Sequence, residues 1–211
     1  MPSITDKKKP KTSQTKAPFL FIGIDEAGRG PLAGPVSVGA VAAPFRRPPL
    51  TFFPKIRDSK QLSAQKRRAI YAELKSAKKR GELIFSCSFV GATTIDKKGI
   101  SYAIHLAIKR TLKKLNLTER EIRVLLDGGL RAPAHYKYQE TIIRGDENET
   151  LIALASIVAK VSRDEKMERL SLKYPNYQLE EHKGYGTAAH VRSIRKHGPS
   201  PLHRKTFLKN I

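Results

Sequence analysis

The sequence predicts an α/β fold built on a mixed β-sheet. Two apolar runs, residues 19–25 and 36–43, flank a Gly/Pro-rich turn and predict two consecutive strands in a hairpin-like relation. Later apolar runs of strand length alternate with stretches in which apolar residues recur every three or four positions, as they do in amphipathic helices. A chain in which strands come first and helices then alternate with strands is typical of a mixed sheet flanked by helices.

The same patterns place the remaining elements. Ser63 caps a predicted helix that ends at Gly81. Residues 151–161 are apolar nearly all round, which indicates a central helix buried on every side. Further strands are expected over 83–90, 123–126 and 138–143, and helices over 63–80, 100–115, 151–161, 165–173 and 187–197.

The charge is strongly positive, with 41 Lys and Arg against 19 Asp and Glu, a formal net charge of +22. Residues 1–16 hold five lysines and one aspartate, so most of the excess belongs to the rest of the chain. A body this basic attracts polyanions, and nucleic acid is the commonest. A surface made basic for solubility is the alternative. We expect a disordered basic arm over 1–17 and one domain over 18–211, with a small helical part from about residue 174.

The location is expected to be cytoplasmic. No apolar run approaches the roughly 20 residues that a membrane crossing needs, and the polar N-terminus lacks the apolar segment of a secretory signal. The single cysteine, Cys87, excludes an internal disulfide and is consistent with a reducing compartment. No membrane partner is expected, and nothing in the sequence requires more than a monomer.

Two adjacent acids, Asp25 and Glu26, stand where the first apolar run gives way to a loop with three glycines. Adjacent carboxylates repel and do not build a core, so a chain that places them at the end of a buried strand normally has a cation for them to hold. Arg29, between Gly28 and Gly30, adds a charged guanidinium group beside backbone amides that no side chain covers. A metal, a cationic side chain and exposed backbone together suit a phosphate-bearing substrate.

Two further acids, Asp127 and Asp146, also lie at a strand end or in a loop. If the strand that ends at Asp127 is a neighbour of the strand that ends at Asp25, three or four carboxylates come within coordination reach. Hard oxygen ligands of this kind suit Mg²⁺ or Mn²⁺. Two alternatives stay open: Asp127 before Gly128 is also an ordinary turn signal, and Asp146 could cap a helix.

Other patterns carry weaker signals. The glycine spacing from Gly28 to Gly34 fits neither a dinucleotide fingerprint nor a P-loop, so a turn that exposes amides to the substrate is the better interpretation. Four histidines near the C-terminus match no common zinc template, and contact with solvent or phosphate is expected for them: His182, His190, His197 and His203.

The chain resembles ribonuclease HII, the type 2 ribonuclease H family, over about residues 19–208. The motifs that carry the resemblance occur in order: DEAGRGPLAGPV from Asp25, DSKQL from Asp58, LLDG ending at Gly128, RGD ending at Asp146, ASIVAKVSRD from Ala155 and HKGYGT from His182. Each could arise by chance, but the ordered set is specific. The resemblance implies a ribonuclease H-like fold, with a five-stranded mixed sheet, flanking helices and a small C-terminal helical part.

The resemblance also implies site residues. The family's four catalytic, metal-binding carboxylates fall on Asp25, Glu26, Asp127 and Asp146. Its Gly-Arg-Gly element matches Gly28, Arg29 and Gly30, whose backbone would sense the 2′-hydroxyl of a ribonucleotide. Its loop tyrosine matches Tyr185, which would pack on the sugar beside the scissile bond. Phosphate positioning or local structure is assigned to four residues in matching motifs: Lys60, Lys160, Arg163 and Lys183.

The implied reaction is endonucleolytic hydrolysis of the RNA strand in RNA–DNA hybrids, including single ribonucleotides embedded in duplex DNA. Cleavage would fall on the 5′ side of the ribonucleotide, use two Mn²⁺ or Mg²⁺ ions and leave 5′-phosphate and 3′-hydroxyl ends. One departure from the pattern is Arg144, where many relatives have lysine, and the two cations differ in geometry.

Three alternative functions were weighed against this one. The sister family, ribonuclease HIII, has a similar core but a sizeable folded N-terminal domain and no arginine in its glycine loop. A basic nucleic-acid-binding module with structural acids would explain the charge, but not why four acids sit beside apolar strands or at glycine turns. A phosphotransferase acting on a free nucleotide fits neither the glycine spacing nor the charge.

Overall fold

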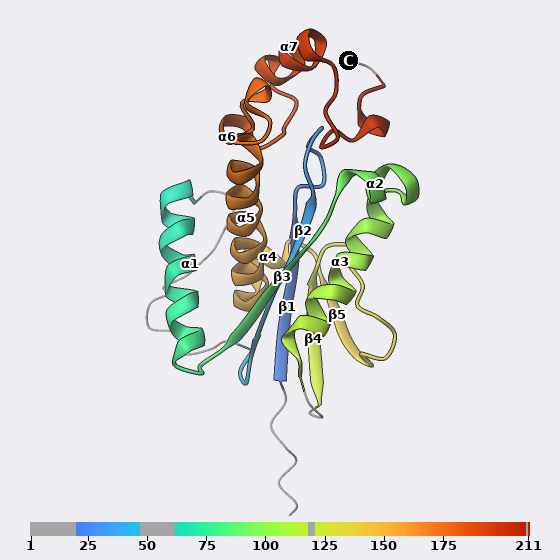
Figure 1. Cartoon of the computed structure of the whole chain (residues 1–211). Helices are drawn as coiled ribbons and strands as arrows, with labels where there is room; N and C mark the ends of the chain where they lie inside the picture. The colour runs from blue at the N-terminus through green and yellow to red at the C-terminus, as the bar shows by residue number, and fades with distance from the viewer. Residues whose placement is uncertain (1–19, 47–61, 118–120, 210) are drawn as a thin grey trace, which may run out of the picture.

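Five strands form one sheet with helices on both faces, and a small helical part follows at the C-terminal end (Figure 1). The computed structural model describes residues 20–46, 62–117, 121–209 and 211. The predicted basic arm over 1–17, Lys60 and most of the Pro-rich loop after residue 44 lie outside these residues.

The strand order is β3-β2-β1-β4-β5, so β1 lies at the centre of the sheet. β1 pairs antiparallel with β2 and parallel with β4, β2 pairs antiparallel with β3, and β4 pairs parallel with β5. The predicted mixed sheet and hairpin-like start are therefore confirmed, and the strands that end at Asp25 and Asp127 are neighbours, as the expected grouping of carboxylates requires. The strands are β1 (Leu20–Ala27), β2 (Val36–Ala43), β3 (Ile84–Val90), β4 (Ile122–Asp127) and β5 (Tyr138–Ile142).

Helices cover the two faces of this sheet. α3 (Ile100–Leu115) packs on one face, and the long α5 (Thr150–Ser171) packs on β1 and β2 from the other, with α1 (Ala64–Lys79) outside it. The two helical segments predicted over 151–173 are one continuous helix. Three short α-helices were not predicted: α2 (Ala92–Lys98), α4 (Gly145–Asn148) and α6 (Leu179–His182).

The central helix lies close to the sheet because glycines face it. A Cβ placed on Gly23 of β1 would lie 2.2 Å from the backbone carbon of Leu151, and one on Gly39 of β2 would lie 2.3 Å from the carbonyl oxygen of Ala155. Every residue of α5 from Leu151 to Ala159 is buried, as the apolar run predicts. This close approach brings the middle of α5 against the end of β1, where the acids lie.

The C-terminal part docks on the loop between β1 and β2. It contains η1 (Pro175–Tyr177), α6 (Leu179–His182), α7 (Ala188–His197) and η2 (Lys205–Phe207), around a small core that includes Ala33 of the loop. The amides of Leu32 and Ala33 donate to the Gly184 carbonyl, and the amide of Gly34 donates to the Leu202 carbonyl. Among the described residues, no helix combines the length and apolarity that crossing a membrane requires.

Replacing Gly39 by alanine should lower the free energy of unfolding by about 2–3 kcal/mol or more, because the added methyl group meets backbone atoms that cannot rotate away. Gly129→Ala is the matched control, since nothing lies within 4 Å of a Cβ at that position. Urea unfolding of both variants measures the effect. Equal losses in the two variants would contradict the close packing of α5 on the sheet.

Candidate active site

Strand alternation decides which acids lie together. Ile22 and Ile24 of β1 point into the core beneath α3, so Asp25 lies on the opposite face, toward α5. In the parallel pair, Ile24 is opposite Leu126, so the next residues along the two strands, Asp25 and Asp127, follow at neighbouring positions, close enough for their charges to interact. Glu26 alternates to the other face. The two acids that share a face are therefore Asp25 and Asp127, which are far apart in the sequence.

These carboxylates oppose one another electrostatically. Burial, and then the neighbouring Glu26 and Asp127 carboxylates, raise the pKa of Asp25 well above its ordinary value, while a hydrogen bond with Ser156 acts in the opposite direction. Burial also raises the pKa of Glu26, Asp127 adds to that rise, and Arg29 reduces it. A divalent cation between the carboxylates would favour their ionised forms.

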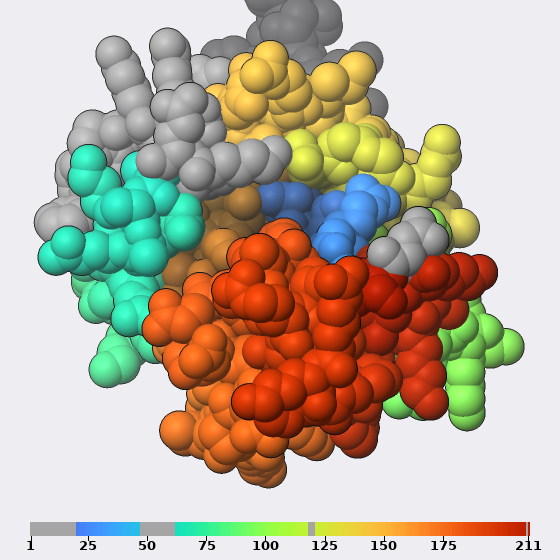
Figure 2. Space-filling model, turned by 90° about the horizontal axis from the view of Figure 1, so that it is seen from above, coloured from blue at the N-terminus to red at the C-terminus, as the bar shows by residue number. Residues whose placement is uncertain are grey.

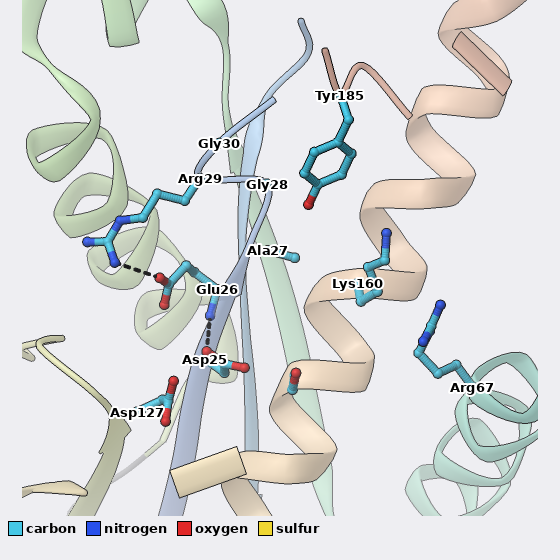
Figure 3. Close-up of a pocket in the computed structure, with 11 residues that line it drawn as sticks. Asp25, Glu26, Ala27, Gly28, Arg29, Gly30, Arg67, Asp127, Lys160 and Tyr185 are labelled. Atoms are coloured by element: carbon cyan, nitrogen blue, oxygen red, sulfur yellow. Dashed lines mark hydrogen bonds and ion pairs between the residues drawn. The ribbon is translucent and has the colours of Figure 1, made fainter. Parts of the chain in front are cut away.

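Hydrogen bonds from the protein hold each acid. The amide of Glu26 donates to Oδ1 of Asp25 at 2.7 Å, and the amide of Gly145 at the start of α4 donates to Oδ1 of Asp127, also at 2.7 Å. Nη1 of Arg29 lies 3.2 Å from Oε1 of Glu26 (Figure 3). The loop after β5 thus fixes the acid at the end of β4.

These acids lie in a cleft of about 440 Å³ at the end of the sheet. Seen from above, the blue end of β1 and the loop after it lie between the orange C-terminal elements and the yellow segments after β4 (Figure 2). The close-up shows Tyr185 and Lys160 on the opposite side of the cleft from the acids, with the Lys160 amine directed along α5 toward Tyr185 (Figure 3). The lining residues are Asp25, Glu26, Ala27, Gly28, Arg29, Gly30, Arg67, Asp127, Ser156, Lys160 and Tyr185.

The donor set fits a divalent metal, because three carboxylates line one cleft and two of them have raised pKa values. The predicted coordination cluster is nevertheless not preformed. Within the described ranges, no three acidic, histidine or cysteine side chains are grouped closely enough to hold an ion as they lie. Asp146 is fully buried on α4 and is not among the residues that line the cleft, so its expected place beside the other three carboxylates stays a prediction.

The predicted binding residues divide into two groups. Gly28, Arg29, Gly30, Lys160 and Tyr185 line the cleft. Tyr185 is 44% exposed, and its ring centroid lies 5.9 Å from Nζ of Lys160. Lys160 also forms an ion pair with Asp164 at 2.8 Å.

Two other predicted binding residues face away from the cleft. Lys183 forms an ion pair with Glu168 at 2.9 Å and donates to the Glu180 carbonyl, so its amine serves the C-terminal part. Arg163 is fully buried, and its Nε donates to the Pro35 carbonyl at 2.9 Å. Local structure, the second of the two roles assigned to both residues, is the one that this geometry fits.

The cleft also contains residues that the sequence did not single out. Arg67 on α1 and Ser156 on α5 both line it. Ser156 lies in the ASIVAKVSRD motif, which was the available signal, whereas Arg67 belongs to a basic helix in which no single arginine stands out. A second fully buried arginine, Arg204, holds the loop after β1 and was also missed.

The expectation that the four histidines contact solvent or phosphate is wrong for two of them. His190 and His203 are buried, and their Nε2 atoms lie 3.1 Å apart. Nδ1 of His203 accepts from the Ser200 amide at 2.9 Å, so its Nε2 carries the proton and donates to His190. His190 in turn donates from Nδ1 to the Tyr185 carbonyl at 2.9 Å. This neutral relay fixes the backbone of the tyrosine in the cleft.

Comparison with known proteins agrees with this arrangement. The family model for ribonuclease HII matches residues 22–210. A ribonuclease HII of Caldicellulosiruptor bescii is 41% identical over 194 residues, which cover 92% of this chain and 89% of the relative. One from Anaplasma phagocytophilum is 41% identical over 188 residues, covering 89% of this chain and 85% of the relative.

Solved structures share the fold. The PCNA:RNase HII complex from Archaeoglobus fulgidus contains a chain that matches with a TM-score of 0.68 at 24% identity, covering 88% of this chain and 93% of that one. Bst-RNase HIII in complex with Mn²⁺ matches with a TM-score of 0.61 at 20% identity, covering 98% of this chain and 70% of that one. At these identities the likeness concerns the fold, and it confirms the predicted ribonuclease H-like architecture.

Replacing Asp25 by asparagine should raise the melting temperature of the metal-free protein, because it removes a buried charge that Glu26 and Asp127 oppose. The same change should abolish stabilisation by Mn²⁺, which in the parent would reach roughly 3 kcal/mol at a hundredfold excess over Kd. Melting curves in EDTA and in Mn²⁺ measure both effects. Glu73→Gln on α1 is the control, and an Asp25→Asn variant that Mn²⁺ stabilises as much as the control would contradict the metal site.

The histidine relay should make the protein sensitive to acid. Burial lowers the pKa of His190 to about 4, whereas its pKa in the unfolded chain is about 6.5. Between pH 6.5 and pH 4, the unfolded state therefore binds a proton at His190 that the folded state does not bind. Stability contributed by His190 should therefore fall by roughly 2 kcal/mol from pH 7 to pH 5. Urea unfolding of the parent and His190→Gln at both pH values tests this, with His105→Gln on the exposed face of α3 as the matched control. For each variant, the free energy of unfolding is subtracted from that of the parent at both pH values. If this difference changes with pH equally for His190→Gln and His105→Gln, the relay is contradicted.

Proposed function

The chain belongs to the ribonuclease HII family and is therefore a metal-dependent ribonuclease that hydrolyses the RNA strand of RNA–DNA hybrids. From this premise we propose which substrates it cleaves and at which bond. It cleaves hybrids and duplex DNA that contains a single ribonucleotide, on the 5′ side of that ribonucleotide. Water adds to the phosphorus and the bond to the 3′-oxygen breaks, which leaves 5′-phosphate and 3′-hydroxyl ends.

One observation carries this proposal. Asp25, Glu26 and Asp127 lie on the same side of the cleft as the Gly28–Gly30 turn, and Tyr185 and Lys160 line its other side (Figure 3). Acids that can hold cations lie beside backbone and an aromatic ring that can contact a sugar. A cleft that served only to bind nucleic acid would gain nothing from three carboxylates, since they repel phosphates.

The metal site would use Asp25, Glu26 and Asp127, with Asp146 completing it. Two divalent ions, when bound, would supply Lewis-acid activation of water and neutralise charge on the phosphate and the departing oxygen. The chain's own contribution is to hold the acids: the β1–β4 pairing places Asp25 beside Asp127, and the Gly145 amide orients Asp127.

The remaining cleft residues would position the nucleic acid. The backbone of Gly28, Arg29 and Gly30 would contact the 2′-hydroxyl, the group that distinguishes RNA from DNA. The half-exposed Tyr185 ring would pack on the adjacent sugar, and Lys160 and Arg67, which line the same opening, would attract phosphates. The net charge of +22 supports a polyanionic partner for the rest of the surface. A monomer in the cytoplasm remains the expected form of the enzyme.

The test uses an end-labelled DNA duplex with one central ribonucleotide, incubated with the protein in Mn²⁺, Mg²⁺ or EDTA. We expect a single nick on the 5′ side of the ribonucleotide in metal and none in EDTA. Asp25→Asn should lower the rate by at least about a thousandfold, while its affinity for the duplex stays equal or rises, because a charge that repels phosphate is gone. Glu73→Gln is the control for handling and folding.

Three results would contradict the proposal in different ways. Binding without a nick in either metal would favour a non-catalytic binding module. A nick only within long RNA tracts would leave the acids catalytic but remove the junction-reading role of Gly28–Gly30 and Tyr185. Cleavage by Asp25→Asn at the parent rate would show that the metal site lies elsewhere.

A further inference from the structure

Two buried arginines hold the loop between β1 and β2 through hydrogen bonds to its backbone. Arg163 of α5 and Arg204 near the C-terminus both have no exposed surface. Their guanidinium groups lie under the loop and donate to its carbonyl oxygens. Among the described residues no ion pair involves either group, and their hydrogen-bond acceptors are backbone carbonyl oxygens. Nη1 of Arg163 is buried there without a hydrogen-bond partner.

Arg204 contacts the Gly-Arg-Gly turn directly. Its Nη2 donates to the Gly28 carbonyl at 2.6 Å, its Nη1 donates to the Arg29 carbonyl at 2.8 Å, and its Nε donates to the Gly34 carbonyl at 3.0 Å. All three nitrogens of the planar guanidinium group therefore donate to carbonyls of one loop. Lysine could not reproduce this, since its ammonium group is a single point donor.

Peptide geometry converts these contacts into an orientation of amides. In a trans peptide, the carbonyl of one residue and the N–H of the next point in opposite directions. Because the Gly28 and Arg29 carbonyls point toward the buried guanidinium, the N–H groups of Arg29 and Gly30 point away from it. Gly28, Arg29 and Gly30 line the cleft, so these two N–H groups belong to a turn that borders the cleft and lie on its side away from Arg204.

The turn has little freedom to change this orientation. Gly28 has a φ of +86°, and a Cβ on it would lie 2.1 Å from Nε of Arg163, so the turn is pressed against the second arginine. Arg163 holds the far end of the loop through the Ala33 and Pro35 carbonyls. The amides opposite those carbonyls belong to Gly34 and Val36, which do not line the cleft.

We propose that Arg204 is a positioning residue for ribonucleotide selection: by holding the Gly28 and Arg29 carbonyls, it aims the N–H groups of Arg29 and Gly30 at the 2′-oxygen of the sugar. This inference rests on the proposed function, in which the same turn reads that oxygen. Arg204 itself touches no substrate. Its effect should appear as lost preference for a ribonucleotide, and not as a general loss of affinity for duplex.

The test compares two duplexes of one sequence, one all-DNA and one with a single ribonucleotide. Dissociation constants are measured in EDTA, where no turnover occurs, for the parent, Arg204→Lys and Arg195→Lys. The last is an exposed position on α7 with the same change of side chain. We expect Arg204→Lys to lose about tenfold of the preference for the ribonucleotide, as the loss of one or two hydrogen bonds would cause, with less than a twofold change for all-DNA.

The outcomes separate this inference from the proposed function. If the parent prefers the ribonucleotide and Arg204→Lys keeps the full preference, the role of Arg204 is overturned and the proposed function stands. If the parent has no preference, junction reading by the turn fails, and the role of Arg204 fails with it. If both affinities of Arg204→Lys fall together while those of Arg195→Lys do not, Arg204 only supports the fold and the inference is overturned.

A second measurement applies if Arg204→Lys does not fold. In the parent protein, the backbone N–H signals of Arg29 and Gly30 are followed by NMR during titration with each duplex. We expect the ribonucleotide duplex to shift these two signals well beyond the all-DNA duplex. Equal shifts with the two duplexes would overturn the proposed orientation of the amides.

Discussion

The parallel pairing of β1 with β4 is the constraint on which the rest of the site depends. It places Asp25 beside Asp127 on the face of the sheet that α5 covers, although 101 positions separate them in the chain. Gly23 and Gly39 let α5 approach that face closely enough to bury Asp25 and bring Ser156 against it. Burial and like charge then raise the pKa of Asp25. The site is thus built at a cost in stability that a bound cation would offset.

The C-terminal part docks on the loop after β1, and this contact places it opposite the end of the sheet. The cleft therefore lies between two walls. One wall carries the acids of the sheet. The other carries Tyr185, whose carbonyl accepts from buried His190 and whose neighbour Gly184 accepts hydrogen bonds from Leu32 and Ala33. Because Arg204 holds the loop from the C-terminal side, the geometry of the Gly28–Gly30 turn, which we propose contacts the sugar, depends on how the C-terminal part docks.

Much of this arrangement could be predicted from the sequence. Apolar runs bounded by glycines located β1, β2 and β4. Residues 151–161 are apolar on nearly every side of the helix, and this pattern identified the central helix. The buried arginines and histidines could not be predicted, because charged and titratable residues are exposed by default and their partners are backbone carbonyls set by tertiary contacts. His190 illustrates this, because it was expected to contact solvent or phosphate and is buried. Arg204 is also fully buried and was not singled out in the sequence. The place of Asp146 in the metal site stays a prediction, because this residue is buried on α4 and is not among the residues that line the cleft.

The most direct test of the central claim is a crystal structure of Asp25→Asn and of the parent, each soaked in Mn²⁺ with a duplex that carries one ribonucleotide, with data collected at the manganese edge. The account predicts anomalous peaks in the parent between Asp25 and Asp127, with the ribonucleotide sugar against Gly28–Gly30, and a weakened or missing peak in the variant. Manganese bound away from these strand ends, or an equal peak in the variant, would contradict the account.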